Sequence, residues 1–460
     1  MTILPAQVNA RLQSVRNHLQ TVPKSIREGR LKRVSGLVLE VEGLPLPLGA
    51  GACIISGSSS TIIDAECIGF NGGTTYLMAI DSMDGVTPGA LVYPANTPYK
   101  TSNGYVVRSS IEPLAIGEEL LGRIVDGFGR PLDGKGGGET KATNSPTKSI
   151  NPLLRTPIHE PLDSGIRSVN AMLTVGRGQR LGIFAGSGVG KSVMLGMLSR
   201  NCVADVIVIG LVGERGREVR EFVDDILGEE ALKRAVVVAA PADSSPLARS
   251  KGAWYATDIA TWFRDQGKHV VLIVDSLTRF AMAQREIGLS LGESPVSRGY
   301  PPSVFAKMPE LVEKVGNGAN PDGSITAFYT VLLEADDIND PVADTARGIL
   351  DGHFFLSREL ADSGHYPAID IEKSISRVMP RVVDEKHLQA ARRVKQLYSR
   401  YMRGRDLLTM GAYAPGTDPD FDVAIRLWPK IQAFLQQDAG NVFNFEESAR
   451  LLLEIAGESQ

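Results

Sequence analysis

A run of small residues followed by lysine and serine is the part of this sequence best suited to chemistry. It reads Ala185-Gly-Ser-Gly-Val-Gly-Lys-Ser192. Glycines let the backbone turn so that several N–H groups point at one anion. Arg180–Phe184 precedes the run as a short strand, and Val193–Leu198 follows it as a helix whose positive end favours negative charge. The pattern predicts a phosphate-binding loop that carries Ala185 where the usual pattern begins with glycine.

Each part of this loop has an expected role toward a nucleotide. Lys191 is expected to reach the β- and γ-phosphates, and the Ser192 hydroxyl is expected to ligate Mg²⁺. ATP and Mg²⁺ are therefore the expected cofactors. The residues expected to contact the nucleotide are Ala185, Gly186, Ser187, Gly188, Val189, Gly190, Lys191, Ser192 and Val193.

Two acidic residues follow apolar runs further along the chain. Val270–Val274 leads directly to Asp275, which is the Walker B arrangement, and Val206–Gly210 leads to Glu214 a few residues later. In an open parallel sheet, ligands lie at the carboxyl ends of the strands. Asp275 is therefore expected to hold Mg²⁺ through water, and Glu214 is expected to polarise the attacking water. A surface charge cluster is the alternative interpretation of Glu214.

The elements that must position these residues can be read from the same pattern. Val206–Gly210, Ala235–Ala239 and Val270–Val274 are apolar throughout, as strands are when helices cover both faces of a parallel sheet. Short β-prone runs between residues 29 and 99, separated by turn residues, predict a small barrel or sandwich. Residues 97–104 are expected to form a linker. Helices are expected near 387–401, 424–437 and 446–455.

The N-terminal segment has a pattern of its own. Val8, Leu12, Val15 and Leu19 form one stripe of a helix, and no acidic residue precedes Glu28. This helix either packs on its own protein or docks on a partner or an anionic membrane surface.

Composition limits the classes of function. The chain has 460 residues, 43% of them apolar and 22% charged, and its net charge is −4. The negative charge argues against nucleic acid as a partner. The three cysteines, Cys53, Cys67 and Cys202, show no metal-ligand spacing and fit a reducing cytoplasm. Neither a membrane-spanning run nor a signal peptide is apparent, so a cytoplasmic location is expected.

Several longer motifs resemble those of a known family. The rotary-type ATPases, which include the F-type catalytic subunit and the ATPases of type III protein export, carry motifs similar to GERGREVREF (213–222), VDSLTRFAMAQREI (274–287), GYPPSVF (299–305), ADDINDP (335–341) and YPAIDIEKSISRVMP (366–380). Three segments resemble the flagellar export branch in particular, namely GRLKRVSGLVLEVEGLPLPLGA (29–50), LGRIVDGFGRPLDG (121–134) and FRDQGKHVVLIVDSLTRFAMAQREIGLSLGE (263–293).

The resemblance implies further roles. Glu214 falls on the catalytic carboxylate of the family, and Arg215 falls on a residue that contacts the γ-phosphate region. Tyr366 aligns with the aromatic residue that stacks on adenine, although alone it would read as a core tyrosine. Arg377 aligns with the arginine finger that a neighbouring subunit supplies, with a structural salt bridge as the alternative. The loop over 335–341 resembles one that faces a central stalk, or is an ordinary turn.

The implied fold is α/β, with a RecA-like P-loop core and its parallel sheet, preceded by a small β-barrel and followed by a helical C-terminal domain. The expected domains are a docking helix over 1–28, the barrel over 29–103, the ATPase domain over 104–384 and the helical domain over 385–460. The implied assembly is a homohexamer at the inner-membrane flagellar export apparatus. The implied partners are a stator-like regulator on the N-terminal helix, a coiled-coil stalk, export chaperone–cargo complexes and the membrane export gate.

Four alternatives share parts of this pattern. An ATP synthase β subunit would carry a strongly acidic segment where this chain has AYAPGTDPDFD (412–422). A non-hydrolysing regulatory subunit would lack Glu214. A Rho-type RNA translocase would need a basic, aromatic-rich N-terminal domain, which residues 29–99 do not provide. The ATPase of a virulence injectisome shares nearly all the motifs and differs mainly in the segment over 29–50.

Overall fold

A computed structural model describes most of the chain, and the described residues are 27–56, 62–95, 97–101, 104–107, 116–135, 150–319, 323–334, 337 and 339–459. The predicted N-terminal docking helix lies outside this set. The chain divides into two compact units, a smaller one that contains the N-terminal strands and a larger one that contains the phosphate loop. Among the described helices, none is long and apolar enough to cross a membrane.

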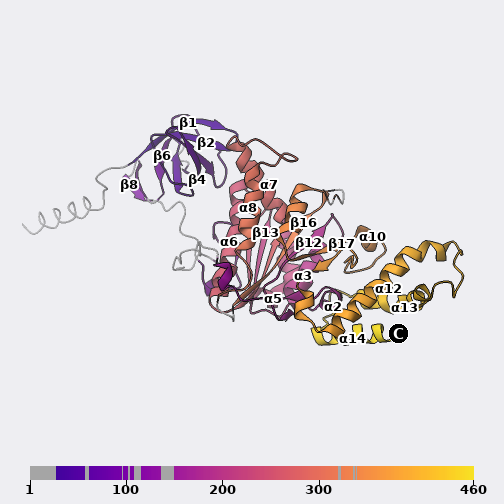
Figure 1. Ribbon diagram of the computed structural model, residues 1–460. Coiled ribbons are helices and arrows are strands. Elements are labelled where there is room, and N and C mark those ends of the chain that lie inside the picture. Colours follow the sequence, from indigo (N-terminus) through magenta and orange to yellow (C-terminus); the bar gives the residue numbers. More distant parts are fainter. Residues whose placement is uncertain are drawn as a thin grey trace, which may run out of the picture. The chain divides into compact units, whose positions relative to one another are not determined.

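Six antiparallel strands form a closed barrel in the smaller unit (Figure 1). In order around the barrel they are β1 (Gly29–Ser35), β2 (Val38–Glu42), β5 (Thr74–Ala79), β4 (Ile62–Asn71), β3 (Gly51–Ile55) and β6 (Leu91–Pro94). Leu39, Val41 and Leu77 are fully buried in its interior, where the apolar side chains of several strands meet. The small barrel predicted from short β-prone runs is therefore confirmed.

The predicted linker over residues 97–104 is wrong in its conformation. Strand β7 (Pro98–Thr101) pairs antiparallel with β8 (Gly104–Val107), with Pro98 opposite Val107 and Thr101 opposite Gly104. Aromatic and β-branched residues favour strands, and they outweigh the turn residues of this segment.

An eight-stranded sheet forms the centre of the larger unit. Its strand order is β18, β17, β12, β16, β15, β13, β14, β9, and only the edge strand β18 runs antiparallel to its neighbour. The strands are β9 (Ile124–Val125), β12 (Arg180–Ala185), β13 (Val206–Val212), β14 (Ala235–Ala240), β15 (His269–Asp275), β16 (Ser324–Leu332), β17 (Gly352–Leu356) and β18 (Ile375–Ser376). A separate pair consists of β10 (Pro161–Leu162) and β11 (Val175–Gly176).

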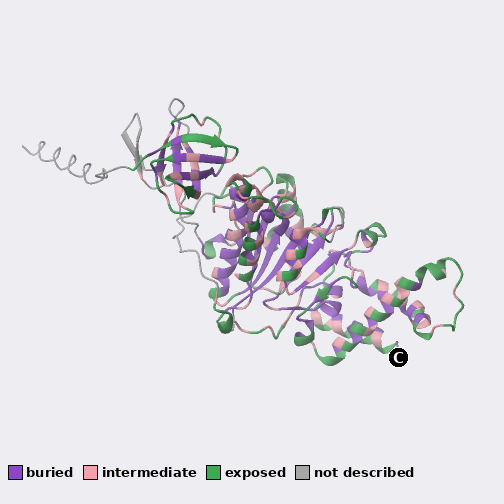
Figure 2. Ribbon diagram, turned by 45° about the horizontal axis from the view of Figure 1, so that its top comes forward, coloured by how far each residue is buried: buried purple, intermediate pink, exposed green. Residues whose placement is uncertain are grey.

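Helices cover both faces of this sheet, and its strands β13, β14 and β15 are buried along their whole length (Figure 2). Along β13, Ile207 and Ile209 belong to the apolar cluster on one face, and Val206 and Val208 belong to the cluster on the other. One face packs on α6 (Pro246–Asp265), α7 (Leu277–Ser290), α8 (Pro302–Glu313) and α9 (Pro341–Ile349). The other packs on α2 (Arg167–Met172), α3 (Lys191–Asn201), α4 (Gly216–Glu221), the π-helical turn η3 (Phe222–Leu227) and α5 (Gly228–Leu232). The double burial explains why these strands read as continuous apolar runs.

The C-terminal part is helical, as predicted. It contains α12 (Glu385–Thr409), α13 (Pro419–Leu435) and α14 (Phe445–Gly457), after the short helices α10 (Arg358–Asp362) and α11 (Met379–Val382). Asp384, Asp418 and Asn444 cap the three long helices by accepting hydrogen bonds from backbone N–H groups three residues ahead. Helix α12 continues eight residues past the predicted end at Tyr401 and passes through Gly404, where a Cβ atom would lie 2.2 Å from the ring of Phe421.

The first residue of β15 should make the fold sensitive to acid. The His269 ring is buried, Nδ1 lies 2.5 Å from Ser324 Oγ, and Nε2 has no hydrogen-bond partner among the described residues. Burial lowers the pKa of His269 from 6.5 to about 4, and the nearby charge of Arg177 adds to the effect. The unfolded chain therefore binds a proton that the folded chain does not, so stability should fall as the pH drops from 6.5 toward 4.

We expect the wild type to lose about 2 kcal/mol of unfolding free energy between pH 7.5 and pH 5 through this group. His269→Asn, which cannot take up the proton and keeps a polar atom near the Nδ1 position, should lose less over the same range. Denaturant titrations of both proteins at each pH give the comparison. Equal losses in the two proteins would contradict the assignment.

Candidate functional site

The predicted phosphate loop joins β12 to α3 (Figure 1). Ala185 is fully buried as the last residue of β12, where it pairs with Leu332 on one side and Leu356 on the other. Gly188 and Gly190 have positive φ values of 76° and 87°, which favour glycine. The turn of the loop therefore depends on its later glycines, and the first position needs only a small buried residue in an extended strand.

Three charged side chains meet beside the loop. The Lys191 ammonium donates to Asp275 Oδ1 at 2.6 Å and to Glu214 Oε1 at 3.1 Å. All three side chains are at least 86% buried, since 14%, 6% and 14% of their surfaces are exposed. Lys191 and Glu214 follow β12 and β13, and Asp275 is the last residue of β15. The three side chains meet because these strands are parallel and end at the same edge of the sheet. The structure thus brings together Lys191, Glu214 and Asp275 as the strand pattern predicted.

Burial governs the electrostatics of this cluster. Burial alone would lower the pKa of the Lys191 ammonium, but the charges of Asp275 and Glu214 more than offset it, so that pKa is raised. Burial raises the pKa of Asp275, while Lys191 and Thr330 oppose the rise. Thr330 Oγ1 donates to Asp275 Oδ1 at 2.5 Å. Lys191 is therefore cationic. Its ammonium lies between two carboxylates, and the phosphate of a bound nucleotide would compete with these carboxylates for it.

Thr330 was missed by sequence reasoning. It lies within β16, and its hydroxyl reaches Asp275 because β16 pairs with β15. In sequence it is one of many β-branched residues of a buried strand. Only the strand order reveals its position.

The outer part of the loop is open for a ligand. Ser187, Gly188, Ser192 and Val193 are exposed, whereas Gly186 and Val189 are buried. Within the described ranges, no group of three or more His, Cys, Asp or Glu side chains could hold a metal by itself. Mg²⁺ commonly binds one or two protein oxygens and completes its shell with phosphates and water. The Ser192 hydroxyl and the Asp275 carboxylate fit a metal that arrives with a nucleotide.

The segment after β13 carries Glu214 and, next to it, the predicted residue Arg215. Gly213 has a φ of 74°, and a Cβ atom there would lie 2.7 Å from the Cβ of Arg279, so only glycine fits the turn that presents Glu214. Arg215 follows as the N-cap residue of α4. Its side chain is 78% exposed, and its guanidinium lies 3.6 Å from Glu218. Arg215 is therefore beside the cluster in sequence but directed to solvent.

Tyr366 lines a cavity next to the loop. The cavity has a volume of about 390 Å³ and is bounded by the start of α3, by Tyr366 with Pro367, and by the segment Gln436–Ala439. The Tyr366 ring is 43% exposed, and a Cβ atom at Gly190 would lie 3.1 Å from it. Tyr366 is thus not a core tyrosine, and its ring borders a space beside the expected phosphates.

The opposite wall, Gln436–Ala439, could not be assigned from sequence. Its position depends on long-range hydrogen bonds. Gln437 Nε2 donates to the carbonyl of Gly165 at 2.9 Å, and its backbone N–H donates to the carbonyl of Tyr366 at 2.8 Å. No local pattern in a loop between two helices predicts such partners.

Arg377 lies away from the loop of its own chain. It follows β18, which pairs with Gly352 and His353 at the beginning of β17. The phosphate loop, in contrast, leaves β12 beside Leu356 at the end of β17. Arg377 is exposed, and its guanidinium donates only to the carbonyl of Arg347, at 3.2 Å, among the described residues. The structure therefore does not bring Arg377 together with Lys191 in one chain.

Part of the predicted stalk-facing segment, over residues 335–341, lies outside the described residues. Of the remainder, Asp337 pairs with Arg298 at 2.8 Å, and Asp340 caps α9 by accepting from Val342 and Ala343. Both contacts suit an ordinary turn, so the stalk-facing role stays a prediction.

Three family models match the chain. They describe the β-barrel domain of the ATP synthase alpha/beta family over residues 31–96, the nucleotide-binding domain of that family over 165–376, and the C-terminal domain of the type III secretion ATPase EscN over 383–454. The nucleotide-binding match contains the loop, Glu214, Asp275 and Tyr366.

Curated relatives match over nearly the whole chain. The flagellum-specific ATP synthase of Salmonella typhimurium is 56% identical and covers 94% of each chain. The proteins of the same name from Pseudomonas aeruginosa and Bacillus subtilis are 54% and 44% identical, over 97% of this chain in both cases.

Solved structures agree in fold. The assembled ATPase EscN from the type III secretion system of enteropathogenic E. coli has a TM-score of 0.84 at 40% identity, over 93% of this chain and 100% of that one. EscN in complex with its central stalk EscO has a TM-score of 0.81 at 39% identity, with the same coverage of both chains. Together with the P-loop cluster, these relationships show that this chain is an ATPase of the ATP synthase alpha/beta family and belongs to the flagellum-specific type III export branch of that family.

Proposed function

We propose that this chain hydrolyses Mg-ATP as a hexameric ring in the flagellar protein export apparatus. The observation that carries the proposal is the convergence of Lys191, Glu214 and Asp275 at one sheet edge, in a chain 56% identical to a flagellum-specific relative. Hydrolysis would support the delivery and unloading of flagellar proteins for export. The protein would act in the cytoplasm, peripherally attached to the inner-membrane apparatus.

Each residue of the site then has a role. The loop amides and Lys191 bind the phosphates, and Lys191 exchanges its two carboxylate partners for phosphate oxygens. Ser192 and Asp275 would hold Mg²⁺, which supplies charge neutralisation on the phosphates when it is bound. Glu214, released from Lys191, orients and polarises the attacking water. Tyr366 stacks on adenine, with Gln436–Ala439 as the opposite wall.

Two arginines complete the proposed site. Arg215, next to Glu214 and free to reorient at the surface, contacts the γ-phosphate region. Arg377 enters the site of the neighbouring copy, where a cation stabilises charge that develops on the transferred group. The position of Arg377 at the opposite end of β17 supports this assignment, because the residue has no route to its own loop within one chain.

One of the proposed partners is supported by a solved relative. EscN has been solved with its central stalk EscO, so a coiled-coil stalk is the proposed partner in the pore of the ring. A stator-like regulator on the N-terminal helix, export chaperone–cargo complexes and the membrane export gate are further proposed partners. Nucleic acid is not among them.

A deletion of the gene tests the flagellar assignment. Cells without it should lack external filaments and fail to swim, and the wild-type gene supplied in trans should restore both. Electron microscopy of filaments and spreading in soft agar give the two readouts. Normal swimming combined with lost effector secretion would instead assign the chain to a virulence injectisome, the second candidate, whose ATPase EscN is 40% identical to this chain.

A further inference from the structure

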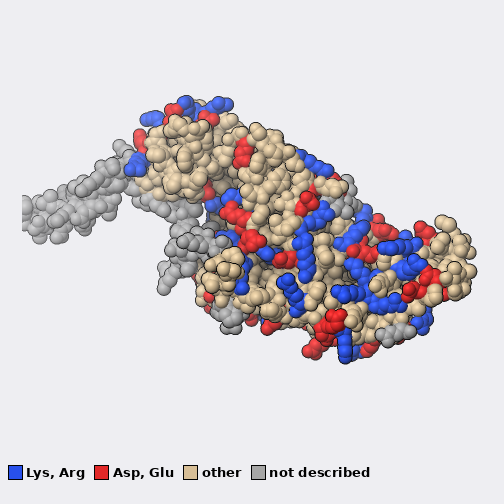
Figure 3. Space-filling view, viewed as in Figure 1, with Lys and Arg blue, Asp and Glu red and all other residues tan. Residues whose placement is uncertain are grey.

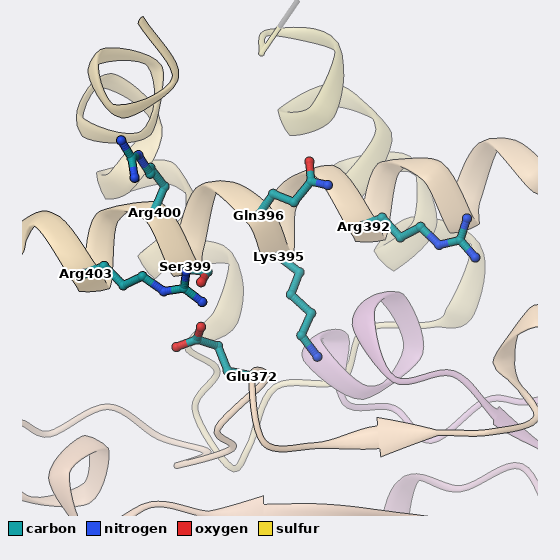
Figure 4. A pocket seen from close by; sticks show the side chains of 7 residues that line it. All are labelled: Glu372, Arg392, Lys395, Gln396, Ser399, Arg400 and Arg403. Carbon is teal, nitrogen blue, oxygen red and sulfur yellow. The ribbon is translucent and has the colours of Figure 1, made fainter. Parts of the chain in front are cut away.

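A basic groove lies on the C-terminal helical part (Figure 4), and it shares no lining residue with the cavity beside Tyr366. Its volume is about 600 Å³, and it lies between α12 and the segment that leads to β18. The lining residues are Glu372, Arg392, Lys395, Gln396, Ser399, Arg400 and Arg403. The lining thus contains four basic side chains and one acidic one, in a chain whose net charge is −4. Figure 3 shows Lys and Arg side chains, interspersed with Asp and Glu, on the C-terminal helical part.

The spacing of the basic residues places them along one side of α12. Arg392, Lys395, Ser399 and Arg403 follow each other at intervals of three and four residues, which aligns side chains on a helix. Lys395 and Arg403 extend toward the segment that carries Glu372 (Figure 4). The groove is therefore an elongated positive stripe with one wall formed by another segment of the chain.

Most of this positive charge is not neutralised within the molecule. Arg400 pairs with Asp418, but within the described part of the chain neither Arg392 nor Arg403 forms an ion pair. Lys395 is half-buried, and its ammonium donates to the carbonyl of Ser374 at 3.4 Å. Burial lowers the pKa of Lys395, and the charges of Glu372 and Asp370 oppose this shift only in part, so a further carboxylate in the groove would favour the charged ammonium.

We propose that this groove binds an acidic segment of a partner protein, whose carboxylates contact Arg392, Lys395 and Arg403. Guanidinium groups bind carboxylates through two parallel hydrogen bonds, and a helix or extended peptide can follow a stripe of this kind. The half-buried position of Lys395 favours a peptide that inserts side chains into the groove, rather than a flat anionic membrane surface. Identifying that partner with a component of protein export rests on the proposed function, whereas the binding itself does not.

A fluorescent peptide rich in glutamate and alanine tests the groove directly. Its anisotropy should rise with the full-length protein, and a lysine-rich peptide of equal length should not bind. Reversing two charges, in Arg392→Glu with Arg403→Glu, should weaken binding by about tenfold or more at low salt. Glu372→Gln removes the one acid of the groove and should strengthen binding. Added salt should weaken binding to the wild type, because the contacts are exposed ion pairs.

Lys386→Glu is the matched control, because Lys386 is exposed on α12 outside the groove and its reversal changes the net charge in the same direction. It should leave peptide affinity within about twofold of the wild type, as expected for a single exposed charge away from the contact. Thermal unfolding of every variant verifies that the fold is intact. Equal peptide affinity in the double reversal and the wild type would overturn the proposal.

Vesicles containing phosphatidylglycerol distinguish the other source of negative charge. If the vesicles bind the wild type but not the double reversal, and the peptide binds neither, the groove is a membrane contact and the proposed protein partner is wrong. Peptide binding that is lost in the double reversal supports the proposal even if the deletion strain proves to swim normally. The groove and the flagellar assignment can therefore fail separately.

Discussion

Lys191→Ala should abolish ATP turnover, with a loss of at least about 10²-fold, as for other single groups that stabilise transition-state charge. The variant loses the side chain that links the loop to both acids, because the Lys191 ammonium lies 3.1 Å from Glu214 Oε1 and 2.6 Å from Asp275 Oδ1. Without the ammonium, the phosphates would face two buried carboxylates and no cation at this position. Phosphate release measured at saturating ATP gives the test.

The same substitution should change the protein in the absence of nucleotide. Removing one partner of a buried ion pair commonly costs about 3–5 kcal/mol, because the remaining charge is left unpaired. The Asp275 carboxyl is 6% exposed, so the unpaired acid should take up a proton more readily or destabilise the folded chain. Thermal unfolding should therefore show a lower midpoint for Lys191→Ala, and a fluorescent ATP analogue should report weaker binding.

Lys386→Ala is the control, since Lys386 is an exposed lysine of α12. It should retain both turnover and unfolding midpoint. Turnover at the wild-type level in Lys191→Ala would show that the nucleotide site is elsewhere. Lost turnover with unchanged nucleotide affinity would limit the role of Lys191 to the chemical step.

The positions of Lys191, Glu214 and Asp275 could be predicted because they depend on local sequence. Each follows a buried strand, and parallel strands of one sheet end at one edge. The order of the strands was not needed for that conclusion. It was needed for Thr330, which contacts Asp275 only because β16 lies beside β15.

The cavity beside Tyr366 could be predicted from the sequence only in part. One wall follows the loop directly, but the other is brought there from residues 436–439 by contacts of Gln437 with Gly165 and Tyr366. These partners are more than 270 positions apart in one case, and no periodicity encodes them. The hairpin of β7 and β8 was missed for the opposite reason, because local turn residues outweighed the strand propensity around them in the prediction.

Mixing two inactive variants should restore ATP turnover if Arg377 acts on a neighbouring copy. Arg377→Ala should bind nucleotide as the wild type does, because Arg377 lies at the opposite end of β17 from the loop. It should nevertheless lose turnover, since an arginine finger typically contributes about 10³–10⁵ to the rate. Glu214→Gln should also be inactive, because the water loses its polarising carboxylate while the fold of the turn after Gly213 is kept.

In a mixed ring, an interface is complete when the Arg377→Ala copy provides Glu214 and the Glu214→Gln copy provides Arg377. With equal amounts and random assembly, about a quarter of the interfaces meet this condition in a ring of identical contacts. Turnover should therefore rise from near zero to a sizeable fraction of the wild-type level, with its maximum near an equal mixture. Preparing the mixture at concentrations where rings form, and measuring phosphate release across the ratios, gives the profile.

A second mixture gives the matched control. Lys191→Ala and Glu214→Gln both damage the side of the interface that carries the phosphate loop, because the two residues contact each other within one chain. No pairing of these copies produces a complete interface, so this mixture should stay inactive at every ratio. Recovery in both mixtures would show that turnover returns for a reason other than the supply of Arg377 by a neighbouring copy. If rings form and neither mixture recovers, the arginine does not act between copies, and its exposed position at the edge of the sheet must serve the fold or another partner instead.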